Sequence, residues 1–108
     1  MLNDETGYQV MRLLQENPEM SQRQVARTLG ISLGKVNYCV RALVRKGWVK
    51  ARNFKNSHNK AAYMYLLTPL GMQQKAQLTV RFLRLKMREY ENLRDQIREL
   101  RQEAERGA

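Results

Sequence analysis

The C-terminal segment of nearly forty residues contains no helix breaker, and this constrains the fold more than any other feature of the sequence. Thr68 and Pro69 are suited to start a helix, because a threonine hydroxyl caps the first turn and proline is tolerated at the first helical position. No further breaker follows before Gly107. At about 1.5 Å per residue the helix is ~55 Å long, which exceeds the ~30 Å width of a small domain. We therefore expect that its far end does not pack on a core formed by the same chain.

Apolar side chains recur on more than one side of this predicted helix. A strip in its first half, with Leu78, Phe82 and Leu85, is expected to cover the domain. A second strip continues with spacings of three and four residues, as in the seam of a coiled coil. The step from Tyr90 to Leu93 shifts the register, so one continuous heptad repeat is not predicted. We expect the second strip to join two copies of the chain in a homodimer through Leu83, Met87, Tyr90, Leu93, Ile97 and Leu100.

Two short helices are predicted near the N-terminus. Apolar residues recur at helical spacing over residues 4–16, and Pro18 ends the pattern because it lacks a backbone N–H. Ser21 stands three residues before Gln24, which is the spacing of a capping box. The second helix therefore begins after Ser21, and Gly30 is suited to the left-handed conformation that ends a helix.

A third helix is predicted over residues 33–46, directly after the second. Ser32 offers an N-cap and Gly47 offers the expected stop. The second and third helices are thus joined by a tight turn. The buried stripe of the third helix is expected to contain Val36, Val40, Leu43 and Val44.

A hairpin is predicted between the third helix and the long C-terminal helix. Residues 48–52 alternate apolar and polar like a half-buried strand, residues 53–60 have a loop composition, and residues 61–67 form a second strand. The expected fold class is mainly α with a small β-hairpin wing. It is a winged helix-turn-helix domain over residues 1–71, followed by a long C-terminal dimerisation helix over residues 72–108.

The positive charge of the chain is concentrated in its middle. Residues 32–60 contain eight Lys and Arg and no acidic side chain. Residues 1–31 contain three basic and four acidic groups, and residues 61–108 contain nine and six. A solubilising surface interleaves both signs, whereas an acid-free basic stretch indicates an anionic partner, most often nucleic acid. The alternative is a solvated face on a basic protein.

The residue types of the third helix suit contacts with double-stranded DNA. In a winged helix-turn-helix this helix enters the major groove, and the hairpin contacts the neighbouring backbone or minor groove. Asn37 has an amide that can bind adenine bidentately, and Lys35 or Arg41 can reach guanine or a phosphate. Free N–H groups at the start of the preceding helix also favour phosphate. The expected DNA-binding residues are Ser21, Gln22, Arg23, Ser32, Leu33, Gly34, Lys35, Asn37, Tyr38, Arg41, Arg45, Arg52, Lys55, Asn56, His58 and Lys60.

Two of these residues have simpler interpretations that the sequence leaves open. Asn37 can be an ordinary solvated residue, and Tyr38 can merely shield the helix. The hairpin cations are expected to contact the DNA backbone, where they position the protein without reading the base sequence.

Catalytic and metal-binding motifs are missing from the sequence. Gly30 to Val36 is superficially like a phosphate-binding loop, but three residues stand between its glycines where four are needed. His58 has no cysteine or acidic cluster near it, and the single cysteine, Cys39, excludes a multi-thiolate zinc site and an internal disulfide. We expect no enzymatic activity, no cofactor and no metal. The acidic N-terminus is unlike a signal peptide, and no apolar run reaches the ~18–20 residues of a membrane span, so no membrane association is expected.

Three stretches resemble the MarR-type regulators that are associated with bacterial exopolysaccharide (EPS) gene clusters. They are LGISLGKVNYC at residues 29–39, KGWVKARNFKNS at residues 46–57 and YMYLLTPLG at residues 63–71, and the arginine-rich last helix is also similar. The resemblance implies a cytoplasmic, dimeric, prokaryotic regulator that binds DNA near polysaccharide genes. Typical MarR proteins are longer, with dimerisation helices from both ends of the chain and often a small-ligand pocket. Here the first helix starts at Asp4 and belongs to the winged domain, so no small-molecule effector is expected.

Two other functions stay open from the sequence alone. The first is a winged-helix adaptor that docks proteins and uses the C-terminal coiled coil. The second is a nucleic-acid binder without sequence preference. The acid-free basic stretch argues against the adaptor, and the polar side chains of Asn37 and Tyr38 argue against a pure backbone binder, which needs only cations.

Overall fold

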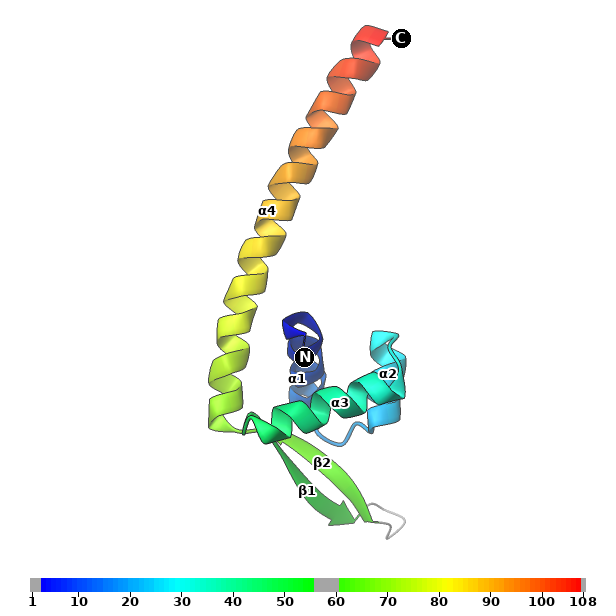
Figure 1. The fold of residues 1–108 in the computed structure, drawn as a ribbon. Helices are drawn as coiled ribbons and strands as arrows, with labels where there is room; N and C mark the ends of the chain where they lie inside the picture. The colour runs from blue at the N-terminus through cyan, green and yellow to red at the C-terminus, as the bar shows by residue number, and fades with distance from the viewer. Residues whose placement is uncertain (1–2, 56–60, 108) are drawn as a thin grey trace. The chain divides into compact units, whose positions relative to one another are not determined.

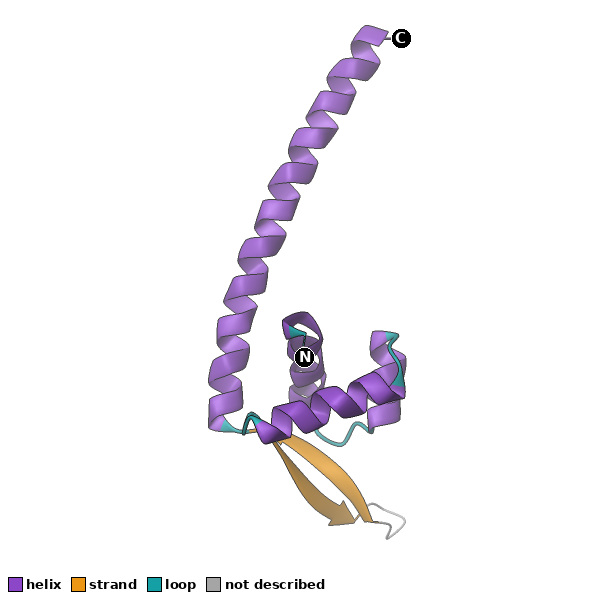
Figure 2. Cartoon of the chain, viewed as in Figure 1, coloured by secondary structure: helices purple, strands orange, loops and turns teal. Residues whose placement is uncertain are grey.

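The computed structural model describes residues 3–55 and 61–107, without the side chains of residues 54, 55, 61 and 62. Figure 1 labels the elements along the chain, and Figure 2 distinguishes the helices from the antiparallel hairpin. The predicted fold class, a mainly helical winged helix-turn-helix with a long C-terminal helix, is confirmed. The elements are α1 (Asp4–Glu16), α2 (Gln22–Leu29), α3 (Leu33–Arg45), β1 (Val49–Lys55), β2 (Ala61–Leu67) and α4 (Pro69–Gly107).

The three short helices begin and end at residues that satisfy their terminal backbone groups. Asn3 caps α1, Ser21 caps α2 and Ser32 caps α3 with a side-chain oxygen that accepts from backbone N–H groups. Ser21 and Gln24 form the capping box that their spacing predicts. Gly30, at φ 68°, ends α2 in the left-handed conformation. These local interactions fix the positions of the helices along the chain.

The core lies where α1 packs against α2, α3 and β2. One prediction about it is wrong: Val44 was expected in the buried stripe of α3, but its side chain is 41% exposed. At about 100° per residue, Val44 lies at the edge of the face that Val36, Val40 and Leu43 define. The side chains that are almost completely buried are Val10, Met11, Leu14, Val25, Val36, Cys39, Leu43 and Val49.

The first strand of the hairpin is longer than the sequence predicts. Residues 53–55 were expected to belong to a loop, but they pair with residues 61–63 in an antiparallel register. Pairing with the facing strand therefore overrides their polar composition, because the backbone supplies the hydrogen bonds of a sheet whatever the side chains are. The strand β2 makes a further hydrogen bond outside the hairpin, since the Tyr65 N–H donates to the Pro18 carbonyl over 3.1 Å. This bond ties β2 to the segment between α1 and α2.

The helix α4 begins at a junction that closes the winged domain. Thr68 donates its hydroxyl to the Gly47 carbonyl over 2.6 Å and accepts from the Gly71 N–H over 3.0 Å. By compactness the chain divides into two units, residues 1–78 and residues 79–108. The first ten residues of α4 thus belong to the first unit, where Leu78 is buried. The rest of α4 makes up the second unit.

Candidate nucleic-acid interface

The helix α3 exposes one face, because its other face is fixed in the core. Val36, Cys39, Val40 and Leu43 are buried on that inner side. At about 100° per residue, the positions opposite them are those of Gly34, Tyr38, Arg41 and Arg45. All four residues are exposed, Tyr38 to 52%.

Two predicted residues lie on the flanks of the outer face of α3. Lys35 lies on one flank, and its backbone N–H donates to the Ser32 side chain. Asn37 lies on the other flank, on the same side of the helix as Val44. Both side chains are exposed, and Leu33 at the start of the helix is 39% exposed. The outer face and its two flanks therefore offer cationic, amide and phenolic groups together.

At the start of α2, two of the three residues expected to contact phosphate make hydrogen bonds within the protein. Ser21 uses both its backbone N–H and its hydroxyl in the capping box. The Gln22 side chain is engaged at both ends: its Nε2 donates to the Tyr65 hydroxyl over 3.1 Å, and its Oε1 accepts from Asn37 Nδ2 over 3.2 Å. The neighbouring Arg23 is exposed. Of the three predicted residues, Arg23 thus has the side chain best placed to reach a phosphate.

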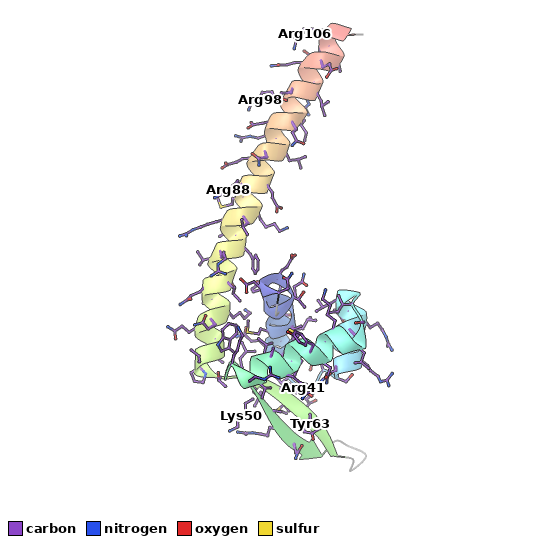
Figure 3. All side chains as sticks on the ribbon, in the orientation of Figure 1. Arg41, Lys50, Tyr63, Arg88, Arg98 and Arg106 are labelled. Carbon is purple, nitrogen blue, oxygen red and sulfur yellow. The ribbon has the colours of Figure 1, made fainter. Side chains whose placement is uncertain are left out.

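A groove lies between α3 and the hairpin, and Gln22 of α2 also lines it. Figure 3 shows Arg41 at the side of α3 next to the hairpin, and Lys50 and Tyr63 on the hairpin itself. The rings of Tyr63 and Tyr65 stack with their centroids 6.3 Å apart. The residues that line the groove are Gln22, Asn37, Val40, Arg41, Val44, Arg45, Ala51, Tyr63 and Tyr65.

The hairpin presents different chemistry on its two faces. Ala51 faces Tyr65 across the strands and lines the groove. Because side chains alternate along a strand, Lys50 and Arg52 lie on the opposite face. Both cations are exposed. The face of the hairpin toward α3 therefore presents tyrosines, and its opposite face presents cations.

Several predicted hairpin residues lie outside the described part of the structure. Lys55 ends β1, and its backbone pairs with Ala61. Asn56, His58 and Lys60 lie outside the described residues.

The cations of the central segment are exposed and are not neutralised by neighbouring acids. Arg12 pairs with Glu16 in α1, and two further ion pairs lie within α4. No described cation of the central segment takes part in an ion pair. Such a cluster attracts a polyanion by a long-range field that falls with salt. The cations concerned are Lys35, Arg41, Arg45, Lys46, Lys50 and Arg52.

Five groove residues were not among the predicted DNA-binding residues: Val40, Val44, Ala51, Tyr63 and Tyr65. Tyr63 and Tyr65 are two residues apart in a predicted strand and so share one face of it, which was the available signal. Tyr63 is 60% exposed. Val44 was missed because its apolar side chain matches the core pattern of α3. That Val44 lines the groove becomes apparent only once the hairpin is placed beside the helix.

Among residues 3–55 and 61–107, no group of three or more His, Cys, Asp and Glu side chains can hold a metal ion. Burial raises the pKa of the Cys39 thiol to about 11, which keeps it in the unreactive neutral form at neutral pH. None of the described helices combines the length and hydropathy that crossing a bilayer requires.

The fold and the position of α3 define a class of protein, the winged helix-turn-helix. Residues 3–50 match the family model for winged helix-turn-helix DNA-binding domains. This match covers the three short helices and the start of β1. No curated protein sequence matches the chain.

Solved structures with the same fold belong to transcriptional regulators. A PadR-like regulator from Bacillus cereus has a TM-score of 0.73 at 11% identity, over 81% of this chain and 89% of that one. The PcaV regulator from Streptomyces coelicolor, solved with its natural ligand, has a TM-score of 0.63 at 22% identity, over 91% and 74%. A MarR/EmrR family regulator from Acinetobacter sp. ADP1 has a TM-score of 0.61 at 17% identity, over 94% and 75%. The chain thus has the winged-helix fold, with structural neighbours in the MarR and PadR families.

Proposed function

We propose that this chain is a sequence-specific regulator of transcription that binds double-stranded DNA as a homodimer and catalyses no reaction. One observation carries the proposal: the outer side of α3 and the adjoining β1 hold exposed cations without acidic partners. The fold uses this helix to enter the major groove. Residues 1–71 bind DNA in this proposal, and residues 72–108 supply the dimer contact. The protein acts in the cytoplasm, where prokaryotic DNA lies.

The binding mode follows from the chemistry of the two elements. The helix α3 contacts base edges, where Asn37 is suited to adenine and Lys35 or Arg41 to guanine. Gly34 has no side chain, which lets the start of the helix approach the bases closely. Arg45 and the cations of the hairpin contact phosphates and position the domain. Two copies of α3 occupy successive major grooves about 34 Å apart on a site with two-fold symmetry.

The proposed homodimer is supported by the exposed apolar seam of α4. Its members are between 42% and 63% exposed, although side chains of this size are usually covered. The occupant we propose is a second copy of this chain. Leu93, Ile97, Leu100 and Ala104 are spaced by four, three and four residues, which lets the same helix face pack against itself. The seam residues are Leu83, Met87, Tyr90, Leu93, Ile97 and Leu100.

The genes that the protein controls are proposed from the sequence resemblance alone. The stretches at residues 29–39 and 46–57 resemble EPS-associated regulators of the MarR type, so the operator is expected next to exopolysaccharide genes. Sequencing of the DNA crosslinked to the protein in its own cells tests this. Bound sites away from such genes would remove the exopolysaccharide assignment and leave the regulator function intact.

The function is tested by titrating the purified protein with its own upstream DNA and with random DNA of equal length, across a range of salt. A preference of about 1,000-fold or more for the upstream DNA is expected of an operator-reading regulator. Footprinting should then reveal two protected half-sites.

Two other results would contradict the proposal. Tight binding without preference would leave a nucleic-acid binder that reads only the backbone. No binding even at low salt would favour the adaptor that docks proteins through its winged domain and its C-terminal helix.

A further inference from the structure

Three side chains from three different elements form a hydrogen-bonded chain that ends at the outer side of α3. The Tyr65 hydroxyl of β2 accepts from Gln22 Nε2 of α2 over 3.1 Å. Gln22 Oε1 accepts from Asn37 Nδ2 of α3 over 3.2 Å. The chain thus runs from the hairpin through the start of α2 to the recognition helix, and all three residues line the groove.

The inner end of this chain is fixed by other contacts. The Tyr65 backbone N–H donates to the Pro18 carbonyl over 3.1 Å, and its ring stacks on Tyr63. Gln22 is the first residue of α2, which the capping box holds in place. Tyr65 and Gln22 are both half-buried, whereas Asn37 is exposed. Tyr65 and Gln22 are therefore held in place by other contacts, whereas the Asn37 amide is accessible to a ligand.

The bond to Gln22 decides which atoms Asn37 can offer. One N–H of the Asn37 amide is used by Gln22, and no other side-chain hydrogen bond of Asn37 occurs among the described residues. The Oδ1 atom and the second N–H are left. Adenine presents a donor at N6 and an acceptor at N7 in the major groove, which matches this pair. A freely rotating amide would lose side-chain entropy on binding the base, whereas a held amide loses less.

We propose that Gln22 and Tyr65 are positioning residues that hold the Asn37 amide for adenine, so that the hairpin contributes to base recognition without touching the base. The inference rests on the proposed function, since it assumes sequence-specific binding. In this proposal Gln22 acts through Asn37. The phosphate contact that its position at the start of α2 predicts is then not its main role. Discrimination at the base that Asn37 reads then depends on the hydroxyl of Tyr65 in β2.

The test starts from the base preferences of the full-length protein. A randomised duplex library is bound and sequenced, and the position whose preference disappears in Asn37→Ala is identified. The same selection is then run with Tyr65→Phe, which removes only the hydroxyl, and with Gln22→Met, which keeps the length of the side chain. Tyr63→Phe is the matched control, because it removes a neighbouring hydroxyl outside the hydrogen-bonded chain. Thermal unfolding of each variant is measured alongside.

We expect adenine at the position that Asn37 reads. Tyr65→Phe and Gln22→Met should each reduce the preference for it by about three- to tenfold, the worth of one neutral hydrogen bond. Preferences at the other positions should stay as in the wild type, and Tyr63→Phe should leave the adenine preference unchanged. In the Asn37→Ala background, Tyr65→Phe should have no additional effect at this position.

Three results would overturn the inference and spare the proposed function. The first is a preference for a base other than adenine at the position that Asn37 reads. The second is an adenine preference that stays unchanged in both Tyr65→Phe and Gln22→Met. The third is an equal loss of preference at all base positions, which would indicate a structural role. Gln22→Met decides the question if Tyr65→Phe does not fold. A wild-type protein without any base preference would overturn the inference together with the sequence-specific function.

Discussion

The backbone of Gly71 in α4 lies directly against the backbone carbonyl of Trp48, so closely that a methyl group on Gly71 would overlap with the carbonyl oxygen. The same oxygen accepts a hydrogen bond from the Thr68 N–H over 3.0 Å. The segment between α3 and β1 and the start of α4 thus meet through main-chain atoms, which leave no space for a side chain.

Gly71→Ala is therefore expected to destabilise the winged domain. The neighbouring atoms belong to the backbone and cannot rotate away, so we expect a loss of about 2–3 kcal/mol in the free energy of unfolding. Chemical denaturation followed by circular dichroism measures it. Gly107→Ala is the control, because an added methyl group meets no atom within 4 Å there. Equal stability of the two variants would show that the junction relaxes easily.

Asn37→Ala should weaken binding to the operator by about 1–3 kcal/mol and relax the preference at one base position. The reason is that the amide supplies both a donor and an acceptor to one base. Competition binding with operators mutated one position at a time measures the effect. An equal loss on the operator and on random DNA would show that Asn37 does not read sequence.

Arg52→Gln should weaken binding to all DNA alike. Removing one phosphate contact lowers the slope of log affinity against log salt by about one. Lys55→Ala should have the same effect. Arg12→Gln removes the same charge from α1, where Arg12 pairs with Glu16 over 3.3 Å, and it should leave the slope unchanged. An equal change of slope in the Arg12 variant would indicate that net charge alone is responsible.

Replacing Leu93 and Ile97 together by serine should dissociate the proposed dimer. These side chains are 55% and 42% exposed, and burying each one in a dimer is worth about 1.5–3 kcal/mol. The dissociation constant should rise at least about 100-fold in sedimentation equilibrium. Gln102→Ser changes a position away from the seam and should leave it unaltered. A wild-type chain that sediments as a monomer would contradict the dimer.

The stability of the fold should fall between about pH 9 and pH 11 because of Cys39. Burial raises the pKa of this thiol from 9.0 to about 11. Above pH 9 the unfolded chain releases the thiol proton while the folded chain retains it, so rising pH favours unfolding. Below pH 9 the thiol contributes no pH dependence. The fall attributable to Cys39 is about 2–3 kcal/mol.

Comparison with Cys39→Ala isolates this contribution from that of every other group in the chain. The difference in unfolding free energy between the two proteins should change over pH 9–11 and be constant below it. A constant difference throughout would mean that the folded protein lets the thiol ionise normally.

Helix boundaries could be predicted well because they depend on neighbours in the sequence. Ser21 and Gln24 cap α2 across three residues, and Gly30 ends it at a positive φ that glycine adopts without strain. The long α4 also follows from local chemistry, since Pro69 starts it and neither glycine nor proline occurs between Gly71 and Gly107. The acid-free stretch of the chain likewise identified the cationic side of the domain.

The order of the elements and the chemistry of the outer face of α3 therefore follow from the amino-acid sequence. What lies beside that face depends on how the chain packs. Asn37 and Gln22 are 15 residues apart, and Gln22 and Tyr65 are 43 apart, so no local pattern links them. The length of β1 depended in the same way on its pairing with residues 61–63. Periodicity and capping act within a few residues, whereas these contacts form only when the core brings distant segments together.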